Sequence, residues 1–100
     1  RFPTPSASDE PTPTGPLLSV TIAGEQVRPN AQEIDLATGE KLMIEVESDR
    51  AGELHVHSTP EQFVEFDAGS TRTQLVIETP GSVEVEDHDT SAVVALIEVR

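Results

Sequence analysis

Residues 41–58 read KLMIEVESDRAGELHVHS, and this stretch decides the fold. Apolar side chains occupy every second position on both sides of a turn, at Leu42, Ile44, Val46, Leu54 and Val56. A period of two is the signature of β-strands that bury one face. The turn, residues 49–52, ends at Gly52, which is free to take a positive φ. The stretch therefore predicts two strands, the second with His55 and His57 on the face opposite its apolar side chains.

The same alternation extends outward from this stretch to Leu17 on one side and to Val99 on the other. Counting the turns between alternating segments gives about seven to eight short strands, the spacing typical of an all-β sandwich. Residues 92–99 are almost continuously apolar, which predicts a central strand covered on both faces. The best helix candidate is a short turn over residues 59–62. We therefore expect an antiparallel Greek-key β-sandwich.

Residues 1–16 read RFPTPSASDEPTPTGP and contain five of the eight prolines. Such a segment has too little apolar surface to offset the entropy lost on ordering. We expect residues 1–16 to be a disordered Pro/Ser/Thr-rich linker, either a tether to a membrane anchor or a plain disordered terminus. The folded domain is then expected over residues 17–100.

Composition excludes several classes of function. The formal net charge of −13 disfavours binding to nucleic acids and to anionic membranes, because both depend on Lys and Arg contacts. The absence of cysteine excludes disulfides and thiolate metal sites. No apolar run is long enough to span a membrane. Motifs of nucleophilic, zinc-protease or phosphate-binding enzymes are absent too, so we expect no enzyme.

The order of several short motifs resembles that of the cupredoxin family. These motifs are GEQVRP (residues 24–29), GEKL (39–42), GELHVH (52–57) and PGSV (80–83). The resemblance covers nearly the whole folded part and is strongest to bacterial exported domains that often follow a lipoprotein tether. It implies a cupredoxin-like sandwich and an extracytoplasmic location, either secreted or as a membrane-anchored lipoprotein.

The family's blue-copper centre cannot be present, because it needs a cysteine thiolate, two histidines and usually an axial methionine. Near the position of the cysteine stand Val85, Glu86 and Asp87, and the only methionine, Met43, lies on an earlier strand. Without the cysteine and the axial methionine, the histidines of the family's site remain as candidate metal ligands. The resemblance supplies His55 or His57 for the first histidine and His88 for the second.

Two or three imidazoles and one carboxylate suit Cu(II) or Zn(II). The candidate ligands are therefore His55, His57, Glu86 (or Asp87) and His88. The alternative is that these histidines are polar groups paired with neighbouring carboxylates. Because nearby carboxylates favour the imidazolium form, we expect at least one histidine pKa above its ordinary value. The acidic run Glu84, Glu86, Asp87 and Asp89 lacks the spacing of a calcium loop and suits a solvated strand edge.

Three functions follow as expectations. The first is a non-catalytic exported domain that serves as an accessory or recognition module for a protein partner. The second is a copper- or zinc-binding protein that uses His55, His57 and His88 with a carboxylate. The third is an immunoglobulin-like adhesion module, which shares the sandwich but not the order of motifs. We expect a monomer, tethered through its N-terminus and not embedded in a membrane.

Overall fold

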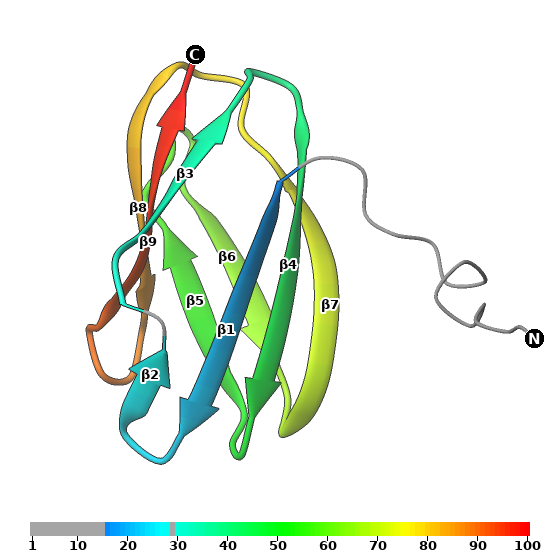
Figure 1. Cartoon of the computed structure of the whole chain (residues 1–100), viewed down its shortest axis with the longest axis vertical. Coiled ribbons are helices and arrows are strands. Elements are labelled where there is room, and N and C mark those ends of the chain that lie inside the picture. Colours follow the sequence, from blue (N-terminus) through cyan, green and yellow to red (C-terminus); the bar gives the residue numbers. More distant parts are fainter. Residues whose placement is uncertain (1–15, 29) are drawn as a thin grey trace, which may run out of the picture.

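The structure, a computed structural model, describes residues 16–28 and 30–100. These residues form nine strands in two layers (Figure 1). The strands are β1 (Leu17–Ala23), β2 (Gln26–Arg28), β3 (Gln32–Leu36), β4 (Lys41–Ser48), β5 (Gly52–Val56), β6 (Gln62–Phe66), β7 (Gly69–Val76), β8 (Gly81–Asp87) and β9 (Val93–Val99). The described part holds no helix capable of crossing a membrane. The linker predicted over residues 1–16 lies, apart from Pro16, outside the described residues.

The strands form a four-stranded sheet in the order β2-β1-β4-β7 and a five-stranded sheet in the order β3-β9-β8-β5-β6. The predicted all-β sandwich is therefore confirmed, with one refinement. Pairs β1–β4 and β3–β9 are parallel, and the other pairs are antiparallel. Parallel neighbours need a long crossover, and here the chain visits the opposite sheet between β1 and β4.

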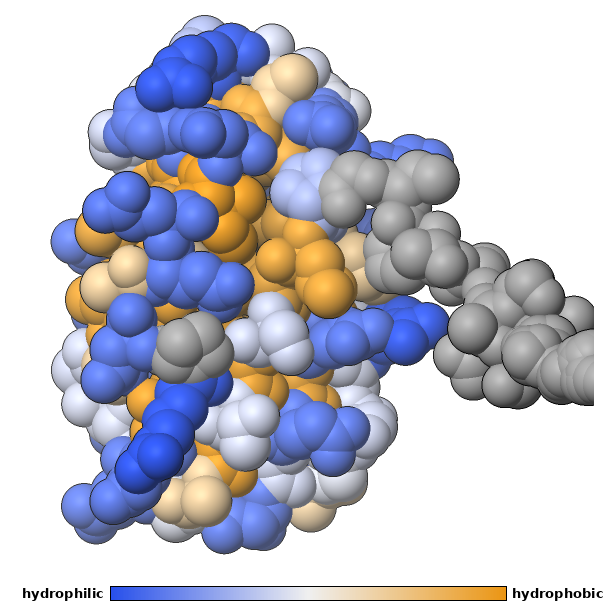
Figure 2. Space-filling model, viewed as in Figure 1, coloured by the Kyte–Doolittle hydropathy of each residue, from blue (hydrophilic) through white to orange (hydrophobic). Residues whose placement is uncertain are grey.

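The core lies between the sheets and is made almost entirely of aliphatic side chains. Each strand turns every second residue inward, as the period of two predicts. Leu18, Leu42, Ile44, Leu54, Val56 and Val85 are completely buried. In Figure 2 hydrophilic residues make up most of the visible surface, and hydrophobic ones show along the middle of this face. Exposed large hydrophobic residues among the described ones are Leu17, Phe63 and Leu96.

Three local predictions were wrong. β9 is central in its sheet, between β3 and β8, but it is not covered on both faces. Its inner face is buried, whereas Leu96 on its outer face is 38% exposed. Residues 59–60 form a bend, and Gln62 already begins β6. Gly52 does not have a positive φ but begins β5. A Cβ there would lie 2.6 Å from Nη1 of Arg50 and 2.7 Å from Cζ of Phe66, so space requires the glycine.

Charge divides unequally between the two sheets. The strands of the four-stranded sheet carry three basic and two acidic residues. Those of the five-stranded sheet carry eight acidic residues and no Lys or Arg. Strand alternation places all of these acids except Asp87 on the outer face. The outer face of the five-stranded sheet is therefore strongly negative, and both His55 and His57 lie on it.

Candidate metal centre

The alternation of β5 turns His55 and His57 outward. Leu54 and Val56 are fully buried, so the residues between and after them point to the outer face of the five-stranded sheet. His57 follows the last residue of β5, and its main-chain N–H donates to the carbonyl of Glu84 at 2.9 Å, which prolongs the pairing with β8. The side chain of His55 is 22% exposed and that of His57 is 36% exposed. The predicted common face of the two histidines is thus present.

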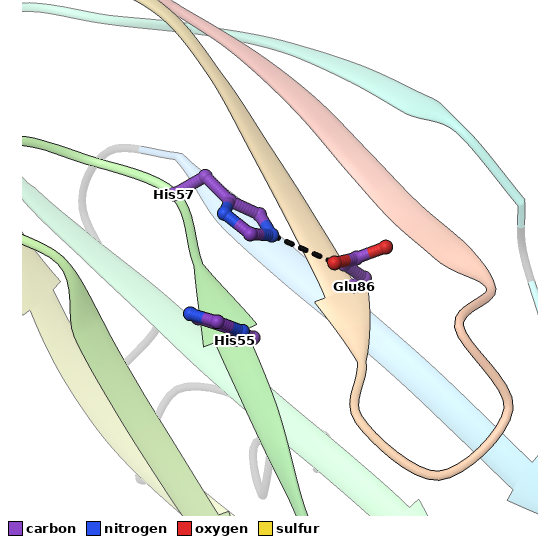
Figure 3. A group of neighbouring side chains, drawn as sticks. All are labelled: His55, His57 and Glu86. Atoms are coloured by element: carbon purple, nitrogen blue, oxygen red, sulfur yellow. Dashed lines mark hydrogen bonds and ion pairs between the residues drawn. The ribbon is translucent and has the colours of Figure 1, made fainter.

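Glu86 reaches the histidines from the neighbouring strand. The register of β5 and β8 places Glu86 opposite His55. Its Oε1 lies 2.7 Å from Nε2 of His57, the contact drawn as a dashed line in Figure 3. One ligand atom from each of His55, His57 and Glu86 lies within 4.8 Å of the other two. Three of the predicted ligands therefore converge.

The imidazole of His55 is held between two rings. It stacks on His57 with ring centroids 4.2 Å apart and on Phe63 with centroids 4.6 Å apart. Phe63 is the residue of β6 paired with His55, and its side chain is 53% exposed. Offset stacking of this kind fixes the plane of a ring. The orientation of His55 therefore depends on its sequence neighbours and on β6.

Glu61 joins the same group and was not predicted. Its Oε2 lies 2.9 Å from Nε2 of His55 and 3.4 Å from Nδ1 of His57. The closer contact has the distance of an ion pair but not the geometry of a hydrogen bond, so the enclosed Nε2 of His55 has no hydrogen-bond partner among the described residues. We call His55, His57, Glu61 and Glu86 the His–Glu cluster.

His88 lies outside the His–Glu cluster. It follows β8, its side chain is exposed, and its main-chain N–H donates to the carbonyl of Glu53 at 3.0 Å. Beyond the end of β8 the strand alternation no longer sets the direction of the side chain. The structure thus brings His55, His57 and Glu86 together but not His88.

Asp87 points the opposite way from Glu86, into the protein. It is completely buried, and its Oδ2 accepts hydrogen bonds from Nη2 of Arg50 at 2.8 Å and from the Oγ1 of Thr90 at 2.7 Å. Arg50 also contacts Asp89 at 3.0 Å. Of the two acids near the position of the family's cysteine, Glu86 faces the histidines and Asp87 pairs with Arg50 inside the protein. The acidic run 84–89 accordingly does not converge on a common point.

The carboxylates shift the protonation of His57. The hydrogen bond with Glu86 raises the pKa of His57 above its ordinary value, and the charges of Glu86, Glu61 and Glu84 add to this against the opposing effect of desolvation. The predicted rise of at least one histidine pKa therefore has a specific physical cause here. Deprotonated, the two imidazoles and a carboxylate oxygen form a donor set suited to Cu(II) or Zn(II).

Comparison with known proteins gives a fold. No known family model matches the sequence, and no curated protein matches it. Among solved structures, a point mutant of amicyanin with Cu(I) has a TM-score of 0.61 at 12% identity, covering 93% of this chain and 89% of that one. A purple cupredoxin from Nitrosopumilus maritimus has a TM-score of 0.59 at 10% identity, with 85% and 99% covered.

A multicopper oxidase matches with a TM-score of 0.59 at 13% identity over 92% of this chain, but only 46% of the oxidase chain is covered. These matches favour the cupredoxin resemblance over the immunoglobulin-like alternative. At such low identity they establish the fold and not the chemistry. The protein is a cupredoxin-like β-sandwich that lacks the cysteine of a blue-copper centre.

Proposed function

We propose that this domain binds a divalent transition-metal ion, Cu(II) or Zn(II), at the His–Glu cluster on the outer face of its five-stranded sheet. The observation that carries the proposal is the convergence of donor atoms from His55, His57 and Glu86 within 4.8 Å of one another. A metal site needs deprotonated nitrogen and oxygen donors at such spacing and a path by which the ion enters. The half-exposed position of the cluster supplies that path.

The enclosed Nε2 of His55 supports this proposal. A buried polar atom with no hydrogen-bond partner costs free energy in the folded protein. A bound cation would satisfy this nitrogen directly. Without a thiolate the site would hold the ion through nitrogen and oxygen donors, and its role would be to bind and release metal rather than to transfer electrons as type 1 copper does.

The wider role in this proposal is that of a non-catalytic accessory domain outside the cytoplasm. We propose that it is monomeric, that it is exported or anchored as a lipoprotein through its N-terminal segment, and that it presents its metal to a protein partner. The acidic outer face of the five-stranded sheet supports a cation-handling role, because clustered carboxylates raise the local concentration of cations.

Titration calorimetry of the tag-free domain with Cu(II) and with Zn(II) tests the proposal. We expect binding tighter than about 10 µM for the wild type. The H57A variant should lose most of this affinity, because His57 contacts both carboxylates of the cluster. H88A is the matched control and should bind as the wild type does, since His88 lies outside the cluster. A wild type that binds neither ion at this level would rule the function out.

A further inference from the structure

Resting on the proposed function, we propose that Glu61 is the carboxylate ligand of the metal and that Glu86 positions His57 without contacting the ion. The metal would then be held by Nε2 of His55, Nδ1 of His57 and Oε2 of Glu61. The simple proximity of His55, His57 and Glu86 suggests a different set, with Glu86 as a ligand. The distances from the two carboxylates to His57 favour the set with Glu61.

The spacing around Glu61 fits a shared ion. Zinc-to-nitrogen and zinc-to-oxygen bonds are about 2.1 Å long, so two donors on one tetrahedral ion lie about 3.4 Å apart. Oε2 of Glu61 lies 3.4 Å from Nδ1 of His57 and 2.9 Å from Nε2 of His55. The same oxygen therefore faces both imidazoles. Its distance to His57 is the separation that a common metal requires, and its distance to His55 would have to open by about 0.5 Å.

The spacing around Glu86 fits a hydrogen bond instead. Its Oε1 lies 2.7 Å from Nε2 of His57, the length of a short hydrogen bond to a charged group. Two donors to the same ion at that distance would have to move apart by about 0.7 Å. Glu86 can keep this hydrogen bond in the metal-bound protein only if Nε2 of His57 carries the proton and the metal binds elsewhere on the ring.

The two ring nitrogens of His57 thus face different carboxylates: Nε2 faces Glu86 and Nδ1 faces Glu61. A histidine that binds metal through one nitrogen commonly donates the N–H of the other to a carboxylate, which fixes the tautomer and the ring orientation. With the proton on Nε2 and directed at Glu86, the lone pair of Nδ1 is free on the side of Glu61. The arrangement of Glu86, His57 and Glu61 therefore matches a carboxylate–histidine–metal chain.

His55 completes the set. Its Nε2 is enclosed, has no hydrogen-bond partner within the described part of the chain and lies beside Glu61, while the stack with His57 and Phe63 holds its ring. Three protein ligands leave a coordination position open, as in zinc sites that exchange ligands rather than in closed structural ones. The side chain of Glu61 is 49% exposed, so this open position faces solvent. A site of this type loads and releases its ion without unfolding the domain.

The test compares E61Q and E86Q by Zn(II) titration, with E65Q as the charge-matched control. Glu65 lies on the outer face of β6 and makes no ion pair or side-chain hydrogen bond among the described residues, and its replacement removes the same charge. Loss of a positioning carboxylate lowers metal affinity about 10- to 100-fold, so we expect this from E86Q and a loss of more than about 100-fold from E61Q. E65Q should stay close to the wild type.

Long-range ¹H–¹⁵N NMR of zinc-loaded wild type reads the assignment directly. We expect Nε2 of His57 to carry the proton and Nδ1 to show the shift of a metal-bound nitrogen. If Nε2 is the metal-bound nitrogen, or if E86Q loses more affinity than E61Q, the division of roles is wrong while the metal-binding function stands. If the wild type binds no zinc, the proposed function fails and this assignment fails with it.

Discussion

Removing the guanidinium of Arg50 should destabilise the domain far more than removing an arginine from its surface. Nη2 of Arg50 lies 2.8 Å from Oδ2 of Asp87, and the Asp87 side chain is completely buried. In R50A this carboxylate would keep the two hydrogen bonds donated by Thr90 but lose its countercharge. Its other oxygen, Oδ1, already has no hydrogen-bond partner among the residues that the structure describes.

Breaking a buried ion pair by removing one partner costs about 3–5 kcal/mol. The Arg50 side chain is 24% exposed, so water can enter the space that it leaves and partly solvate Asp87. We therefore expect the lower end of this range, a loss of about 3 kcal/mol in the free energy of unfolding. R72A is the matched control. The side chain of Arg72 is 60% exposed and pairs with Glu45 on the surface, where such pairs contribute about 1 kcal/mol or less.

Equilibrium unfolding in urea, followed by far-ultraviolet circular dichroism, measures the difference, because the chain has neither Trp nor Tyr for fluorescence. With an m-value of about 1 kcal/mol/M, R50A should lower the midpoint by about 3 M or leave the domain unfolded in water. The reasoning would be refuted if R50A and R72A lost the same stability, or if R50A lost less than about 1 kcal/mol.

The remaining predictions concern the His–Glu cluster, the core and Gly52. NMR titration of the metal-free domain should give His57 a pKa above its ordinary value, and E86Q should lower it, because the hydrogen bond with Glu86 is the largest cause of the rise. A histidine whose pKa is raised in the folded protein stabilises the fold below its unfolded pKa, and this stabilisation is lost as pH rises through the folded pKa. The stability advantage of wild type over E86Q should therefore be larger at about pH 5.5 than at about pH 8.5. An equal advantage at both pH values would contradict the pairing of His57 with Glu86. I44A should cost about 2–5 kcal/mol in urea unfolding, because Ile44 is fully buried, whereas the exposed L17A should cost much less. G52A should destabilise the domain and shift the NMR signals of Arg50 and Phe66, because the added methyl group would meet both side chains. G69A is the control: a methyl group there meets open space and is strained only by the positive φ, so the NMR signals of Arg50 should not shift.

Strand alternation alone predicted much of the fold and part of the site. It placed Leu54 and Val56 inside and both His55 and His57 outside, as the structure has them. The same rule separates Glu86 from Asp87, because adjacent residues of a strand face opposite ways. The sequence interpretation kept both as candidates, since it did not follow the alternation to the end of β8.

Other features depend on how the strands pair and on side-chain contacts, which periodicity does not report. Glu61 belongs to the cluster because β6 pairs with β5 and brings Phe63 beside His55. The parallel pairs arise from crossings between sheets. Gly52 was assigned to a turn for its conformational freedom, whereas the actual reason is the side chain of Arg50 passing close to its Cα on the way to Asp87. A single sequence contains no record of that contact.

The unequal charge of the two sheets has a kinetic consequence. Cations diffusing toward the domain meet a more negative potential at the outer face of the five-stranded sheet than at that of the four-stranded sheet, so they arrive preferentially at the face that carries the histidines. At roughly 0.1 M ionic strength, salt screens such a field beyond a distance of about 10 Å. If the domain binds metal as proposed, the rate of metal capture should fall steeply with added salt, while the rate of release, set by the local donor atoms, changes little.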